Sequence, residues 1–205
     1  MKKKSKKSLK KKLVDNKIIR TLILSDVFIL SGFGLISPIL AVFFTDQIQG
    51  GSVGVAGFAS TIFLLVKSAL ILPIARFLDC TKGEKDDFYV MICGSVLTSI
   101  VPFSYLVIKT PLAVYAVQML YGLGEALSYP SWLAIFTRHI GRRKTSFTWG
   151  LYYMLTNAFG AMTAGIGGVL ANYLGFKPLF VLVGVMSLVG SSVLLFFYSG
   201  IRKSK

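Results

Sequence analysis

Residues 53–78 read VGVAGFASTIFLLVKSALILPIARFL, and this stretch decides the fold class. Lys67 is its only charged residue before Arg76, so the apolar run exceeds the roughly 20 residues that a helix needs to cross a bilayer. The strands of a membrane barrel alternate apolar and polar side chains, and this stretch does not. Backbone groups in lipid must find partners within their own segment. We therefore predict a transmembrane α-helix here.

Similar apolar stretches occur on both sides of this one. The chain has 205 residues, of which 54% are hydrophobic and only 15% are charged, whereas soluble domains have about 45–50% and about 25%. The loops between the stretches are too short to hold a soluble domain. We predict an all-α polytopic membrane protein whose single bundle covers residues 18–200, with six transmembrane helices at 18–44, 53–78, 88–108, 112–136, 147–174 and 179–199.

Lysine and arginine are unevenly distributed between the loops. If the N-terminus is cytoplasmic, the inner segments 1–20, 76–87, 137–144 and 200–205 hold 10, 3, 4 and 3 of the 23 basic residues. The outer loops then hold only Lys109 and Lys177. Cytoplasmic loops of membrane proteins carry such an excess. Both termini are therefore predicted to be cytoplasmic, and the protein is predicted to be a multi-pass protein of the cell (inner) membrane.

The two ends of the chain are basic. Residues 1–17 begin MKKKSKKSLKKK, a run without an aromatic residue that could stack on a base. We predict a solvated cytoplasmic tail that contacts anionic lipid and does not bind nucleic acid. Residues 201–205 form a short basic cytoplasmic end.

An internal repeat is visible at a spacing of about 90 residues. GFG at 32–34 precedes Ser37 and Pro38, and GLG at 122–124 precedes Ser128 and Pro130. The ends of the second and fifth stretches, IARFLD and LANYLG, are also similar. We interpret the six helices as two three-helix repeats, which must be inverted because three is odd. The alternative is chance recurrence of Gly, Ala and Leu.

Three charged residues lie well inside predicted spans, at the depth of the hydrocarbon: Asp26, Lys67 and Glu125. An unpaired charge at the bilayer centre costs roughly 2.5–3.5 kcal/mol or more. Lys67 could pair with Asp26 or Glu125 merely to fix helix register. We favour the alternative, in which the three residues line a polar pathway for a solute or a coupling proton.

Other residues of types that often form functional sites have simpler interpretations here. Gly160, Gly165, Gly167 and Gly168 are predicted to allow close helix packing. Cys80 and Cys93 lack metal-ligand spacing, and we expect no metal and no cofactor. His139 is the only histidine and no zinc-protease motif is present, so we do not expect an enzyme.

The loop ARFLDCTKGEK at 75–85 resembles the signature between helices two and three of the major facilitator superfamily. Asp79 occupies the acidic position of the signature, and Cys80 replaces the basic residue that usually follows it. The other motif residues are Ala75, Arg76, Lys82, Gly83 and Lys85. GLGEALSYP at 122–130, GIGG at 165–168 and LGFKPLF at 174–180 also resemble the N-terminal six-helix half of that family.

The resemblance implies a secondary transporter that moves a small solute, and protons, by alternating access. It places Asp26 and Glu125 in a central cavity, with Gln118 where many members have arginine. It also makes Asp79, with Arg76, a latch at the cytoplasmic gate. Six helices are half of the family's usual number, so a homodimer, a separate second half or a fragment is expected. The alternative function is a non-transporting membrane scaffold or assembly partner.

Overall fold

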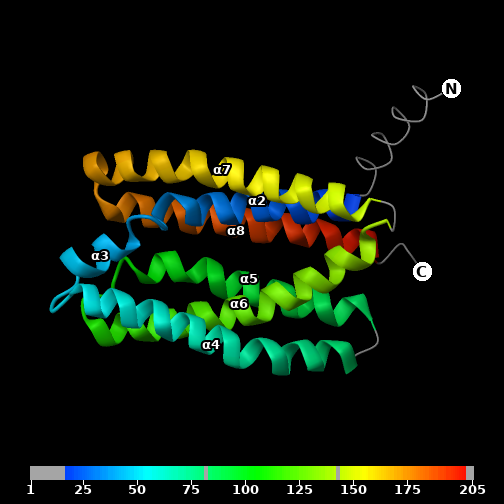
Figure 1. Ribbon diagram of the computed structural model, residues 1–205, viewed down its shortest axis with the longest axis horizontal. Helices are drawn as coiled ribbons and strands as arrows, with labels where there is room; N and C mark the ends of the chain where they lie inside the picture. Colours follow the sequence, from blue (N-terminus) through cyan, green and yellow to red (C-terminus); the bar gives the residue numbers. More distant parts are fainter. Residues whose placement is uncertain (1–16, 81–82, 142–143, 202–205) are drawn as a thin grey trace.

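A computed structural model describes residues 17–80, 83–141 and 144–201 of the chain. The basic tail at 1–16, Lys82 of the gate motif and residues 202–205 lie outside these ranges. Within them the regular structure is entirely helical (Figure 1), with helices α2 (Lys17–Ile36), α3 (Leu40–Asp46), α4 (Val53–Cys80), α5 (Glu84–Ser104), α6 (Pro111–His139), α7 (Thr145–Leu174) and α8 (Phe176–Ile201).

Five of the described helices are long and apolar enough to cross a membrane, namely α2, α4, α5, α7 and the Phe176–Leu195 part of α8. The remaining long helix, α6, has 29 residues but is less apolar, because it contains Gln118, Glu125 and several Gly, Ser and Tyr residues. The all-helical membrane fold is confirmed. The count of six crossing helices stays a prediction.

The first predicted span, 18–44, is not one continuous helix. α2 ends at Ile36, residues 37–39 form a turn, and α3 has only seven residues. Pro38 causes this break, because proline donates no backbone hydrogen bond and disfavours helical geometry at the residue before it. At about 1.5 Å per residue, α3 is too short to cross a bilayer. It packs Phe43 and Phe44 into the core at one end of the bundle.

The long helices form two layers, with α2, α7 and α8 in one and α4, α5 and α6 in the other (Figure 1). α2 packs mainly on α7 and α8, and α6 packs mainly on α4 and α5. The layers meet most extensively where α5 contacts α8. These main contacts are equivalent when α2 is exchanged with α6, α4 with α7 and α5 with α8. The α2–α7 and α2–α8 contacts then correspond to the α6–α4 and α6–α5 contacts. α2 begins and α8 ends at the same end of the bundle (Figure 1).

Glycines set the closest helix contacts, but only two of the four predicted ones take part. A Cβ on Gly167 would lie 1.9 Å from the carbonyl oxygen of Leu35, and one on Gly34 would lie 3.0 Å from that of Gly160. A Cβ on Gly160, Gly165 or Gly168 would meet nothing within 4 Å. Of the four, Gly167 has no room for a side chain beside α2, whereas Gly160 lies near α2 through its backbone, opposite Gly34.

Candidate functional site

A cavity of about 200 Å³, here called the central cavity, lies between the two layers. Asp26 reaches it from α2, Lys67 from α4 and Glu125 from α6, so the three predicted ionisable residues share one site. The rest of its wall is Ile29, Leu30, Met91, Ser95, Thr98, Ser128, Tyr129, Trp132, Tyr152 and Leu194.

Lys67 and Glu125 form an ion pair inside the central cavity. Their Nζ and Oε2 atoms are 2.9 Å apart, and each side chain is about a quarter exposed, 25% and 24%. The pair can form because α4 and α6 approach closely at Gly122, where a Cβ would lie 2.8 Å from the carbonyl oxygen of Phe63. The sequence allowed Lys67 to pair with Asp26 or with Glu125, and in the structure it pairs with Glu125.

Asp26 has a different environment. The hydroxyl of Tyr152 on α7 donates a hydrogen bond of 2.9 Å to its Oδ2. No lysine, arginine or histidine in the described part of the chain forms an ion pair with Asp26. The ammonium group of Lys67 is paired with Glu125. The carboxylate of Asp26 therefore has no matching positive charge among the described residues of the cavity.

Aromatic rings form much of the cavity wall. The ammonium of Lys67 lies 5.1 Å from the ring centre of Tyr129, and the rings of Trp132 and Tyr152 are 4.9 Å apart. Trp132 is only 6% exposed, and its indole N–H has no hydrogen-bond partner in the described structure. Sequence reasoning missed these residues. Their signal was the spacing of Tyr129 and Trp132 at four and seven residues after Glu125, which places all three on one helix face.

Gln118 does not share the central cavity. It lines a second cavity of about 330 Å³ toward α3, where its amide donates to the hydroxyl of Tyr105 at 3.2 Å. None of the described residues that line this second cavity, which we call the outer cavity, is charged. The remaining lining residues are Phe33, Ile36, Ser37, Leu40, Ala41, Phe44, Ala56, Ser60, Phe63 and Tyr121.

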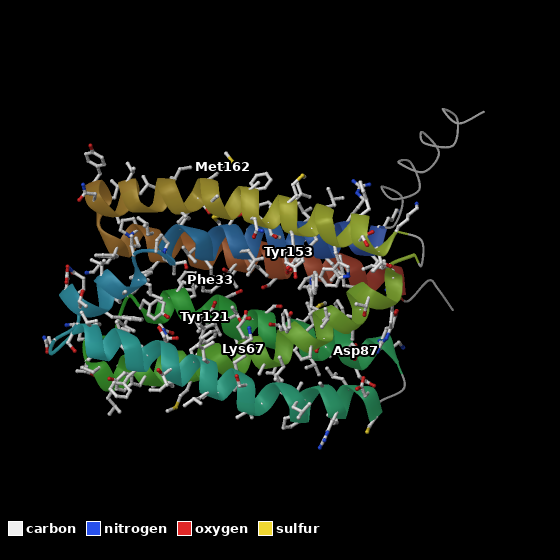
Figure 2. All side chains as sticks on the ribbon, viewed as in Figure 1. Phe33, Lys67, Asp87, Tyr121, Tyr153 and Met162 are labelled. Carbon is white, nitrogen blue, oxygen red and sulfur yellow. The ribbon has the colours of Figure 1, made fainter. Side chains whose placement is uncertain are left out.

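A stack of three rings forms part of the wall of the outer cavity. Tyr121 of α6 lies between Phe33 of α2, with ring centres 5.1 Å apart, and Phe63 of α4, with ring centres 4.5 Å apart. Figure 2 shows Phe33, Tyr121 and Lys67 following one another from one layer to the other. Phe63 and Tyr121 each precede an ion-pair residue by one helical turn, so the stack borders the outer cavity and covers the ion pair.

The family model of the Major Facilitator Superfamily matches residues 22–205. The chain belongs to the major facilitator superfamily. A comparison with curated proteins gave no match. Membership together with the apolar helices establishes a transporter-like, multi-pass membrane protein.

The segment that resembles the superfamily's loop signature runs from the last turns of α4 to the first turn of α5. Ala75, Arg76 and Asp79 are in the last turns of α4, and neither Arg76 nor Asp79 forms an ion pair within the described chain. Gly83 is the N-cap residue of α5, and Lys85 is exposed in its first turn.

An ion pair that sequence reasoning missed lies beside this signature. Asp87 of α5 is fully buried and accepts a hydrogen bond from the guanidinium of Arg138 at the end of α6. His139 Nε2 lies 3.6 Å from Glu84 Oε1 in the same region. The positive-inside rule was sufficient to explain Arg138, so nothing in the sequence pointed to its partner. These contacts join the first turn of α5 to the last turn of α6.

Proposed function

We propose that the protein is a secondary active transporter that moves a small solute across the cell (inner) membrane by alternating access. One observation carries the proposal: Asp26, Lys67 and Glu125 converge from three helices on the central cavity. Ionisable residues are costly in a membrane and usually mark a solute or ion pathway. A structural role would account for the Lys67–Glu125 pair, but it leaves Asp26 in the cavity without a cation.

We further propose that α2, α4, α5, α6, α7 and α8 are six transmembrane helices in two inverted repeats, with both termini cytoplasmic. The exchangeable packing partners support the repeats. The common end of the bundle at which α2 begins and α8 ends supports the shared location of the termini. Inverted repeats with a site near the midplane are a frequent transporter architecture.

We propose that a second half completes the carrier, either as a second copy in a homodimer or as a separate chain. α4 and α7 bury the smallest share of their apolar windows, 11% each, and so offer surface to lipid or to such a half. Arg76 and Asp79 are exposed at the end of α4, as latch residues that contact a second half need to be. Mass photometry in nanodiscs would measure the copy number. A monomer that transports alone would contradict this part of the proposal.

The roles of the cavity residues follow from their chemistry. Glu125 and Lys67 form a pair that a solute or a proton can open, and Asp26 is a carboxylate able to hold a proton or a cation. Gln118 is a neutral hydrogen-bonding group on the route through the outer cavity.

Transport by the full chain in proteoliposomes tests the function. Solutes of different charge would be applied under an imposed proton gradient, with currents recorded on a solid-supported membrane. We expect Glu125→Gln to abolish coupled uptake while the protein still folds, because the neutral amide can neither pair with Lys67 nor exchange a proton. Asp46→Asn, an exposed change in α3, is the matched control. Unchanged uptake by Glu125→Gln would refute the assignment, and a wild type that moves no solute would favour the scaffold alternative.

A further inference from the structure

The unbalanced charge of the central cavity lies at Asp26. The ammonium of Lys67 is satisfied by Glu125 at 2.9 Å and by the ring faces of Tyr129 and Phe63, at 5.1 and 5.7 Å. Among the described residues, Asp26 has only the neutral hydroxyl of Tyr152 as its donor. A solute anion would have to displace Glu125 from Lys67, whereas a solute cation would find a carboxylate with no cationic partner.

The rings beside Asp26 are suited to an organic cation. Tyr152 binds Asp26 through its hydroxyl, and its ring lies 4.9 Å from that of Trp132. Aromatic faces attract ammonium groups, most strongly where water is excluded. The contact of Lys67 with Tyr129 shows that the same wall already holds one ammonium in this way.

The indole N–H of Trp132 is an independent sign of a ligand. Buried polar groups in folded proteins are almost always hydrogen-bonded. Trp132 is 6% exposed and lines the cavity, yet its N–H has no acceptor in the described structure. An acceptor brought by a solute would satisfy it, and an oxygen in a hydroxyl, ether or carbonyl group has the required chemistry.

We infer that the central cavity binds a small organic monocation that also has a hydrogen-bond-accepting oxygen. Asp26 binds its charge, the rings of Trp132 and Tyr152 contact its apolar part, and the Trp132 N–H donates to its oxygen. This inference rests on the proposed function, because it takes the cavity to be the solute site. A volume of about 200 Å³ limits the solute to roughly a single-ring molecule.

Binding can be measured with Trp132 as the reporter. The full chain with Trp149→Phe, which leaves Trp132 as the only tryptophan, would be placed in phosphatidylcholine nanodiscs and titrated with (3-hydroxybenzyl)trimethylammonium. Empty nanodiscs correct for partition into lipid. We expect saturable quenching. The neutral 3-hydroxybenzyl alcohol should bind at least about tenfold more weakly and benzyltrimethylammonium, which lacks the oxygen, about fivefold more weakly.

Two sets of variants assign the contacts. Asp26→Asn should weaken binding of the cation about tenfold or more, Asp26→Glu should keep it within a few-fold, and Asp46→Asn should not change it. Trp132→Phe, with Trp149 retained as the reporter, should remove the preference for the hydroxylated cation.

Equal binding of the cation and the neutral alcohol, or full affinity in a folded Asp26→Asn protein, would overturn the inference. Failure of the inference can be told apart from failure of the proposed function. Cation binding at Asp26 without any transport would overturn the function and support the inference. Coupled transport of an anion or a neutral solute, with no cation binding, would do the reverse.

Discussion

Lys67 of α4 and Glu125 of α6 hold their charged groups 2.9 Å apart in the middle of a bundle whose helices are otherwise apolar. Loss of either partner would leave the other as an isolated charge at membrane depth and would lower the stability of the fold without abolishing it. Their pairing also decides which carboxylate of the central cavity stays unmatched. That residue is Asp26, and its only bonded donor in the described structure is Tyr152.

The ion pair predicts a recovery of stability in a double variant. Lys67→Met should lower the free energy of unfolding by about 2.5 kcal/mol, since Glu125 keeps its charge without a partner. Adding Glu125→Gln should restore most of this loss. Denaturation in mixed micelles, followed by tryptophan fluorescence, measures both effects. Additive losses in the double variant would mean that the two side chains do not interact.

The α2–α7 contact predicts opposite effects for two neighbouring glycines. Gly167→Ala should destabilise the protein by about 3 kcal/mol, the upper range for overpacking, because the new Cβ would lie 1.9 Å from the carbonyl oxygen of Leu35. Gly165→Ala meets open space and should be neutral or stabilising by up to about 1 kcal/mol. Thermal midpoints in detergent compare the two variants. Equal midpoints would contradict the close approach.

The buried ion pair at the end of α6 predicts unequal costs for its two partners. Arg138→Gln should cost about 3 kcal/mol, because Asp87 is fully buried and would lose the partner of its charge. Asp87→Asn should cost only about 1 kcal/mol, since the Arg138 side chain is 42% exposed and water can solvate it. Chemical denaturation of each variant measures the difference. Small and equal losses for the two variants would contradict the burial of the Asp87 carboxylate.

The ring stack predicts a barrier between the two cavities. In a background with both native cysteines changed to serine, Ser128→Cys places a thiol in the wall of the central cavity. Removing the middle ring with Tyr121→Ala leaves a void between the cavities, so a membrane-impermeant maleimide added on the α3 side should label this thiol about tenfold faster. Tyr153→Ala, an exposed change on α7, is the control. An unchanged rate would show that the stack does not limit access.

The apolar runs predicted the class of fold, because membrane crossing depends on length and composition. The family motifs predicted the superfamily. The break at Pro38 was not predicted. The presence of a proline was not a sufficient signal, because Pro73, Pro102 and Pro130 lie within unbroken helices. Whether a proline ends a helix depends on what the next residues can pack against. Here Phe43 and Phe44 of α3 enter an aromatic core formed with residues far along the chain, including Tyr105 and Phe180.

The sequence predicted which charged residues form the central cavity, but it only partly predicted which of them contact one another. The cost of a charge in lipid identified Asp26, Lys67 and Glu125. The partner of Lys67 depended on helix rotation and on the close approach at Gly122, and neither can be read from one sequence. Gln118 was grouped with the charged residues because it stands where many members of the superfamily have arginine. Seven residues of separation, about two turns, were enough to place it in a different cavity.

The layered packing also affects how the protein is made. The hydroxyl of Ser25 on α2 donates to the carbonyl oxygen of Gly190 on α8, across 165 residues of chain. The main partners of α2 are α7 and α8, which are synthesised after α4, α5 and α6. α2 must therefore stay in the membrane without its main partners until α7 and α8 are made, and α4, α5 and α6 can pack together before then. Truncation of α8 should consequently expose the earliest helix, α2, to quality-control proteases while the α4–α6 layer is still able to form.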